Sequence, residues 1–169
     1  RWDIIRGSID EYVWPTTYNV SPSSFMGKLR KNTRLNFDLP TEAQWEYACR
    51  AGTTSEYYKV GVTKDTFAKA GLARYVGNSG SYSQEIQSGG SWENATQGTA
   101  IVGSYKSNDW GLYDMLGNVN EWVLDRLRAG VDPEYAVTGS YRILRGGRWR
   151  VDEYACFCRF RTSALTTGQ

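Results

Sequence analysis

Apolar residues recur every third or fourth position most clearly between Thr41 and Ala51, and this period is typical of an amphipathic helix. Trp45, Ala48 and Cys49 share one face of the predicted helix and are candidates for the core. Gly52 follows the last apolar position, where a glycine can adopt the left-handed conformation that ends a helix.

A shorter helix is predicted to begin after Ser21, which can cap its first amide groups. Pro22 would occupy the first helical position, where a missing amide hydrogen costs little. Phe25 and Leu29 are four residues apart and so lie on one face, and Asn32 is a natural end.

No such period runs through the chain from Thr53 to Ala100, which is rich in glycine and scattered polar residues. We predict long ordered loops here, held either by a metal ion or by the buried rings of Tyr75, Tyr82 and Trp92. The N-terminal stretch Arg1–Val20 is also predicted to be irregular, because Trp14-Pro15 blocks a helix.

Alternating apolar and polar residues predict strands in the last third of the chain, at Val119–Leu124, Tyr141–Leu144 and Cys156–Thr162. Few helices and many loops around short antiparallel strands favour an α+β fold. The length of 169 residues is typical of one domain.

Composition excludes several kinds of chemistry. The chain has no histidine, which removes Ser-His and Cys-His nucleophile pairs and histidine-ligated metal sites. A net charge of +2 gives no overall argument for nucleic-acid binding. No run approaches the roughly 18 apolar residues of a membrane span.

Three cysteines, Cys49, Cys156 and Cys158, cannot all pair within the chain. Buried free thiols are the simpler interpretation. A disulfide of Cys49 with Cys156 or with Cys158 is the alternative, and the sequence does not choose between the two.

Three longer segments carry a family resemblance: LPTEAQWEYACRAGTT at Leu39–Thr54, WGLYDMLGNVNEW at Trp110–Trp122 and RILRGGRW at Arg142–Trp149. Their order and spacing resemble the formylglycine-generating enzyme, or sulfatase-modifying factor, family. The resemblance implies a C-type-lectin-like fold that is rich in loops. It also implies one domain over residues 1–169 that lacks the family's N-terminal part and its closing C-terminal strand.

The resemblance also bears on catalysis. Enzymes of this family bind copper(I) through two cysteines, four and nine residues after the second glycine of the Gly-Gly pair, and oxidise a substrate cysteine. Counted from Gly147, the ninth residue is Cys156 but the fourth is Val151, and Arg148 replaces the usual serine. Because copper(I) favours two soft thiolates, we expect no copper here, and Cys156 is the one catalytic candidate if the chain is active.

Variable proteins of diversity-generating retroelements also resemble this domain and use the segment after the Gly-Gly pair as a binding surface. Tyrosine, tryptophan and arginine dominate binding hot spots, and the segment is rich in aromatic residues and arginines. The candidate ligand-binding residues are Arg148, Arg150, Val151, Asp152, Glu153, Tyr154, Phe157, Cys158, Arg159 and Phe160.

Family members hold calcium in a loop whose motif corresponds here to Asn108, Asp109, Gly111 and Tyr113. Calcium prefers side-chain and backbone oxygens, which such a turn provides. An Asx turn at Asn108 without a metal is the alternative.

Two further features have structural explanations. Glu121 is expected to be a buried, hydrogen-bonded carboxylate rather than an acid catalyst. The arginine-rich C-terminal part is expected to form a solvated face, and nucleic-acid binding is the minor alternative. Its arginines are Arg142, Arg145, Arg148, Arg150, Arg159 and Arg161.

These observations favour a non-catalytic module that binds a protein or cell-surface ligand. The alternative is a copper-dependent oxidase that converts a sulfatase cysteine to formylglycine. The sequence leaves the compartment open, with secretion or display at the cell surface among the options.

Overall fold

The computed structural model describes residues 2–7, 20–79, 98–127 and 141–165, so the predictions for Trp14-Pro15, Tyr82 and Trp92 lie outside the described residues. The chain forms two compact units. The first comprises Arg1–Thr41, Trp122–Ile143 and Ser163–Gln169, and the second comprises Glu42–Glu121 and Leu144–Thr162.

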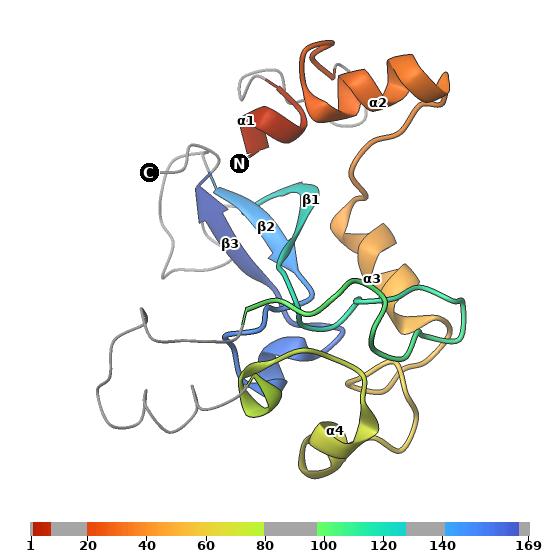
Figure 1. Ribbon diagram of the computed structural model, residues 1–169, viewed down its shortest axis with the longest axis vertical. Helices are drawn as coiled ribbons and strands as arrows, with labels where there is room; N and C mark the ends of the chain where they lie inside the picture. Colours follow the sequence, from red (N-terminus) through yellow and green to blue (C-terminus); the bar gives the residue numbers. More distant parts are fainter. Residues whose placement is uncertain (1, 8–19, 80–97, 128–140, 166–169) are drawn as a thin grey trace. The chain divides into compact units, whose positions relative to one another are not determined.

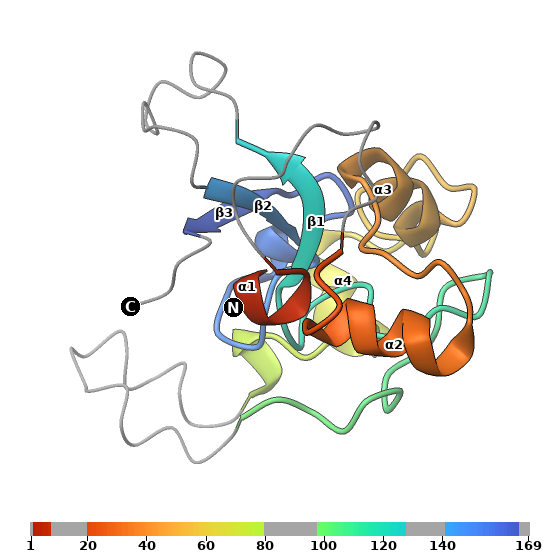
Figure 2. The same cartoon turned by 90° about the horizontal axis from the view of Figure 1, so that it is seen from above.

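Two helices of the first unit, α1 (Trp2–Ile5) and α2 (Phe25–Thr33), lie side by side (Figures 1 and 2). Helix α2 begins after Ser24, whose hydroxyl accepts a hydrogen bond from the Gly27 amide at 3.1 Å. The prediction that Ser21 caps this helix was therefore wrong. The amide of Ser24 donates to the Ser21 carbonyl at 3.0 Å, so Ser21 opens a turn ahead of the helix.

A three-stranded sheet has the order β1 (Glu121–Arg126), β2 (Tyr141–Arg145), β3 (Thr162–Leu165) (Figure 1). The Leu127 amide donates to the Tyr141 carbonyl at 3.2 Å. The end of β1 therefore meets the start of β2, so these two strands are antiparallel. The first two predicted strands are confirmed to within two residues.

The third predicted strand, Cys156–Thr162, was wrong, because β3 starts only at Thr162 and a 3₁₀ turn, η4 (Glu153–Cys156), comes before it. The alternation of buried residues was nevertheless real. Cys156 and Cys158 are both completely buried, but they lie in a turn and an irregular stretch instead of on one strand face.

Packing of the first unit centres on aromatic rings and one arginine. Trp2 and Trp122 meet edge to face with ring centroids 5.8 Å apart. The guanidinium of Arg142 lies 4.4 Å from the centre of the Trp2 ring and donates to the Leu124 carbonyl at 2.6 Å. A buried arginine is satisfied in this way by a ring face and a backbone oxygen.

In the second unit, helix α3 (Glu42–Arg50) confirms the strongest helix prediction, and Trp45 and Cys49 are buried as expected. Gly52 has φ +88°, which agrees with its predicted place after the helix end. The left-handed conformation already begins at Ala51, which has φ 46°.

The second unit also holds a helix that the sequence analysis missed, α4 (Lys64–Ala70), within the predicted loop region Thr53–Ala100. Thr63 and Thr66 form a capping box, and Gly71 ends the helix with φ 68°. Only Phe67 of this helix is buried, so the segment lacks the apolar repeat on which the prediction relied.

An aromatic core holds the connections of the second unit together. Phe67 stacks on Tyr57 with centroids 4.2 Å apart and meets Tyr75 edge to face at 5.0 Å. Phe157 meets the same Tyr57 ring at 5.1 Å. The predicted role of Tyr75 as a buried anchor of the loops is confirmed, since its side chain is 5% exposed.

Candidate binding surface and candidate metal sites

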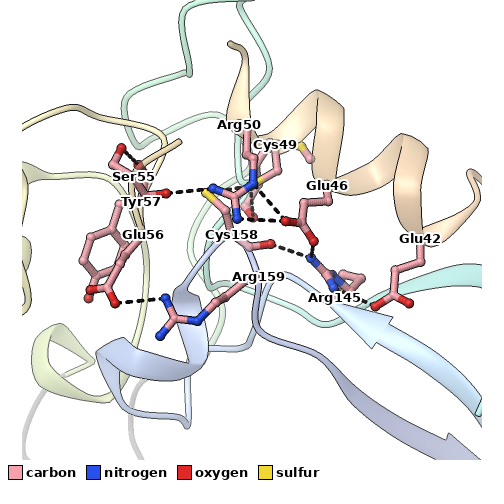
Figure 3. Close-up of polar contacts among 11 residues, drawn as sticks. Glu42, Glu46, Cys49, Arg50, Ser55, Glu56, Tyr57, Arg145, Cys158 and Arg159 are labelled. Carbon is pink, nitrogen blue, oxygen red and sulfur yellow. Dashed lines mark hydrogen bonds and ion pairs between the residues drawn. The ribbon is translucent and has the colours of Figure 1, made fainter. Parts of the chain in front are cut away.

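Arg145, at the end of β2, joins helix α3 to the candidate binding segment, residues 148–160 (Figure 3). Its guanidinium contacts Glu42 and Glu46 at 2.7 Å each and donates to the carbonyl oxygen of Cys158. The side chain is only 2% exposed. Two carboxylates and one carbonyl therefore compensate a buried cation, which is the condition for burying a charge.

Charge balance continues along helix α3. Burial acts to raise the pKa of Glu46, but hydrogen bonds from Arg50 and Arg145 outweigh it and hold that pKa below its ordinary value. Arg50 also donates to the Ser55 carbonyl at 2.8 Å, so the helix end is tied to the chain that follows it (Figure 3).

The Gly146-Gly147 pair turns the chain into the binding segment. Both residues have positive φ values, 86° and 77°. A Cβ atom on Gly147 would lie 2.6 Å from the Ala155 carbonyl oxygen, so no other residue fits this close approach.

Three hydrogen bonds fix the backbone of the segment. The carbonyls of Val151 and Glu153 accept from the Val76 amide at 3.0 Å and from the Tyr57 hydroxyl at 3.3 Å. The Cys158 amide donates to the Glu56 carbonyl at 2.7 Å. The segment is thus irregular in conformation but anchored along its length.

Most of the predicted binding residues do reach the surface of this segment. Tyr154 and Arg159 are 50% and 57% exposed. Arg159 contacts Glu56 at 2.9 Å and lies 4.7 Å from the centre of the Phe157 ring, and Tyr154 meets Phe160 edge to face at 6.2 Å. The exposed members are Arg148, Asp152, Tyr154 and Arg159, and the half-buried ones are Arg150, Val151, Glu153, Phe157 and Phe160.

Cys158 is the exception, because it is completely buried and its side chain is not at the surface. The arginine-rich part does not form one solvated face either. Arg142 and Arg145 are each 2% exposed, and Arg161 contacts Glu42 at 2.7 Å. Carboxylates and rings already engage these cations, which weakens the nucleic-acid interpretation.

The residues at the two family copper positions do not fit a copper(I) site. Val151 offers an aliphatic side chain and no ligand atom. Burial, together with the nearby charges of Glu153 and Asp152, raises the pKa of the Cys156 thiol to about 12, which disfavours the thiolate that copper binds. We therefore assign no oxidative step to these residues.

At the candidate calcium loop, Asn108 is 3% exposed and fully hydrogen bonded within the protein. Its side-chain oxygen accepts from the amides of Trp110 and Leu112 at 3.1 and 3.0 Å. Its side-chain nitrogen donates to the carbonyls of Ala48 and Cys49 at 2.7 and 3.2 Å. Asn108 thus closes an Asx turn and fastens the loop to helix α3.

This geometry does not fit Asn108 as a calcium ligand, because both lone pairs of its oxygen already accept amide hydrogens. Asp109 and Tyr113 point outward, with 63% and 53% of their side chains exposed, and Asp109 lies 3.6 Å from Lys59. Gly111 has φ +78°, as the tight turn requires. Calcium binding at this loop stays a prediction.

Glu121 is half-buried and not fully buried as expected, and its carboxylate accepts a 2.6 Å hydrogen bond from the indole nitrogen of Trp45 in helix α3. The expectation of a hydrogen-bonded carboxylate is right, although the donor is a side chain and not a backbone amide. Burial raises the pKa of Glu121, the Trp45 hydrogen bond partly offsets this, and the charge of Asp114 adds to the increase.

Few helices, a small antiparallel sheet and long anchored connections define a loop-rich α+β domain with a C-type-lectin-like fold. The model of the family described as "Sulfatase-modifying factor enzyme 1-like domain" matches residues 16–168. The chain belongs to this family.

The chain is similar to three proteins with different names. A formylglycine-generating enzyme of Streptomyces coelicolor is 35% identical over 152 residues, which cover 77% of this chain and 41% of the enzyme. The solved structure of Treponema denticola variable protein 1 is 30% identical with a TM-score of 0.57, covering 76% of this chain and 42% of that one. The structure of PvdO from Pseudomonas aeruginosa is 25% identical with a TM-score of 0.61, covering 85% and 52%.

The chain therefore spans less than half the length of the curated formylglycine-generating enzymes that it matches. Within the described ranges, no helix combines the length and the apolar character that crossing a membrane requires.

Replacing Arg145 tests the buried ion network. Arg145→Ala should lower the free energy of unfolding by about 3–5 kcal/mol, because Glu42, Glu46 and the Cys158 carbonyl lose the buried cation that they share. Arg161→Ala is the matched control, since this 41% exposed arginine contacts the same Glu42 and should cost about 0–1 kcal/mol. Urea unfolding measures both, and equal losses would contradict the network as described.

Asn108→Ala should lower the free energy of unfolding by about 2–4 kcal/mol, because buried backbone groups lose their partners. The exposed neighbour Asp109 provides the control, and Asp109→Ala should change stability by less than about 0.5 kcal/mol. Thermal melts of the unchanged chain with calcium and with EDTA test the metal prediction separately. Identical melting temperatures in the two buffers would rule out a stabilising calcium ion.

Glu121 should make stability depend on pH. A carboxyl whose pKa is raised in the folded state binds its proton more tightly when folded, so stability is present below the unfolded pKa and is lost as pH rises through the folded one. Glu121→Gln keeps an acceptor for Trp45 but cannot ionise. Its melting temperature relative to the unchanged chain should therefore increase between pH 4 and pH 7, and a constant difference would exclude this explanation.

Proposed function

We propose that this chain is a non-catalytic binding module that contacts a protein or cell-surface ligand through the exposed side of residues 148–160. The supporting observation is that the segment has two sets of side chains, one buried and one exposed. Ala155, Cys156 and Cys158 are buried and hold the backbone, whereas Arg148, Asp152, Tyr154 and Arg159 are exposed. Substitutions of the exposed side chains should therefore leave the packed core and the backbone of the segment intact.

The exposed side chains have the chemistry of a binding surface. Tyrosine and arginine supply most of the energy in protein interfaces, and rings that are already held in place lose little entropy on binding. Phe157 and Trp149 support the guanidinium groups of Arg159 and Arg150, at 4.7 and 4.3 Å from the ring centres. The surface is therefore partly ordered before a ligand arrives.

The comparison with a variable protein supports the same proposal. That protein is 30% identical to this chain, and the match covers 76% of this chain. A fold that accepts variation needs positions whose side chains do not carry stability. The four exposed positions Arg148, Asp152, Tyr154 and Arg159 come nearest to this requirement, since the ion pair of Arg159 with Glu56 is itself exposed and should contribute only about 0–1 kcal/mol.

The second candidate function is the copper-dependent oxidation of a sulfatase cysteine, which the match to formylglycine-generating enzymes favours. Cys156 keeps one family position, but Val151 occupies the other. A single buried thiol with a raised pKa gives copper(I) neither the number nor the type of ligands it prefers.

Randomising the four exposed positions tests the binding proposal. A library at Arg148, Asp152, Tyr154 and Arg159, displayed on this chain and selected on purified hen lysozyme, should yield folded binders. Most members should melt within about 5 °C of the unchanged chain, because exposed substitutions cost little. A matched library at the buried Ala155, Cys156 and Cys158 should mostly unfold. The proposal would be contradicted if most members of the library at the four exposed positions unfolded, or if no folded member bound lysozyme.

An oxidase assay separates the two candidates. The unchanged chain and Val151→Cys are each incubated with copper(I), oxygen and a cysteine-containing sulfatase peptide, and the peptide is analysed for aldehyde by mass spectrometry. The binding proposal expects no aldehyde from the unchanged chain. Aldehyde formed by the unchanged chain, at a rate that Cys156→Ser abolishes, would establish the oxidase instead.

A further inference from the structure

Helix α2 and the stretch that follows it, residues 25–37, carry positive charge without any acidic residue (Figure 1). Lys28, Lys31 and Arg34 are all exposed. In the part of the chain that the structure describes, no carboxylate lies within ion-pair distance of these three cations. We call residues 25–37 the basic surface, because its exposed charges are all of one sign.

The first carboxylate after the basic surface does not neutralise it. Asp38 accepts two hydrogen bonds from Arg6 at 2.8 and 2.9 Å, and the guanidinium of Arg30 lies 3.4 Å away. Two arginines therefore share this one carboxylate. The charges of the two exposed lysines and of Arg34 remain available to an anionic partner.

Exposed apolar side chains lie among these cations. Phe25 and Leu35 are each 57% exposed, and Phe37 is 41% exposed. Phe25 and Lys28 are three residues apart in helix α2 and so share one of its faces. The helix has no fully buried residue, so a ring and a cation extend from the same side of it into solvent.

Hydrogen bonds hold the stretch after the helix in place. The Arg34 amide donates to the Arg30 carbonyl at 2.8 Å, and the Leu35 amide donates to the Thr33 hydroxyl at 3.3 Å. The Arg30 side chain donates to the Phe37 carbonyl at 2.6 Å. The apolar side chains of Leu35 and Phe37 are thus carried by an anchored backbone, which loses little conformational freedom when they bind.

We propose that the basic surface binds to a membrane surface that contains anionic phospholipids. The cations contact the lipid phosphate groups, and Phe25, Leu35 and Phe37 enter the boundary between head groups and acyl chains. Basic residues combined with exposed phenylalanine and leucine are typical of segments that lie on a membrane. A nucleic acid would attract the same cations, but it offers no apolar phase to a leucine. This inference does not rest on the proposed function, since the basic surface and residues 148–160 have no residue in common.

Helix α4 provides an internal comparison. It also exposes two lysines, Lys64 and Lys69, but Lys64 lies 3.3 Å from Glu153 and Asp65 occupies the first turn of the helix. Its phenylalanine, Phe67, is buried. The same number of lysines is therefore accompanied by acidic residues and by no exposed ring, so helix α4 should not bind lipid.

The charge test uses the whole chain and vesicles of phosphatidylcholine and phosphatidylglycerol at three to one, with binding measured by co-sedimentation. The unchanged chain should bind these vesicles, should bind pure phosphatidylcholine far more weakly, and should be released by salt. Each cation at an anionic surface strengthens binding by about fivefold, so Lys28→Gln with Lys31→Gln should weaken it by about 25-fold. Lys64→Gln with Lys69→Gln is the matched control and should leave binding unchanged.

The apolar contribution is tested separately. Leu35→Ser should weaken binding to the same vesicles by about tenfold, because a leucine side chain no longer leaves water. Ile101→Ser is the matched control, since Ile101 is 84% exposed and lies outside the basic surface. All these substitutions change exposed side chains, so circular dichroism should show every variant folded like the unchanged chain.

Four results would overturn the proposal. Two are equal binding to pure phosphatidylcholine and equal losses for the two lysine pairs. A third is an unchanged affinity of Leu35→Ser, because the surface would then attract charge without entering the lipid. The fourth is release of the chain from the vesicles by a single-stranded DNA oligonucleotide at a phosphate concentration below that of the anionic lipid, which would identify a nucleic-acid surface instead.

Discussion

The buried guanidinium of Arg145 is the interaction on which the second unit depends. It is only 2% exposed, and it gathers Glu42 and Glu46 of helix α3 and the carbonyl of Cys158 around one positive charge. Once this cation is buried, its partners must come with it, because an uncompensated charge in the interior is far more costly than the pairs are favourable. The helix and the binding segment are thus held at a fixed spacing by charge balance and not by regular secondary structure.

That spacing has chemical consequences for the neighbouring sulfurs. Because Arg145 holds the Cys158 carbonyl beside helix α3, the Cys158 side chain comes to rest 3.4 Å from Cys49. The hydrogen bond from Cys49 lowers the pKa of Cys158, and the charges of Arg50 and Arg145 add to this against the effect of burial. One interaction therefore places the segment and brings the two sulfur atoms close together. The exposed side chains of the segment, such as Tyr154 and Arg159, take no part in this buried network and contact only partly exposed neighbours.

The sequence predicted the elements whose signal is local. Helix α3 and the first two strands follow from apolar periodicity, and Trp45 and Cys49 are buried as that pattern requires. Helix α4 was missed because it buries only Phe67. The cap of α2 was misplaced because Ser21 and Ser24 are both serines, and their residue type does not tell them apart as caps. At the candidate site, the sequence found the exposed Tyr154 and Arg159. It also predicted buried free thiols, which the structure confirms, but it placed Cys158 on the binding surface as well. It offered the Asx turn at Asn108 only as an alternative, because the hydrogen bonds that fasten this side chain to helix α3 join residues distant in the chain.

The residues at the two family copper positions, Val151 and Cys156, contribute to the structure in different ways. Cys156 is completely buried, and its sulfur would lie 3.4 Å from a Cβ at Gly147, so it fills space beside the Gly-Gly turn. Val151 is only half-buried, and the structure uses its backbone carbonyl, which accepts from Val76, instead of its side chain. A thiol at position 156 thus contributes packing whether or not copper binds, whereas a thiol at position 151 would contribute only as a ligand.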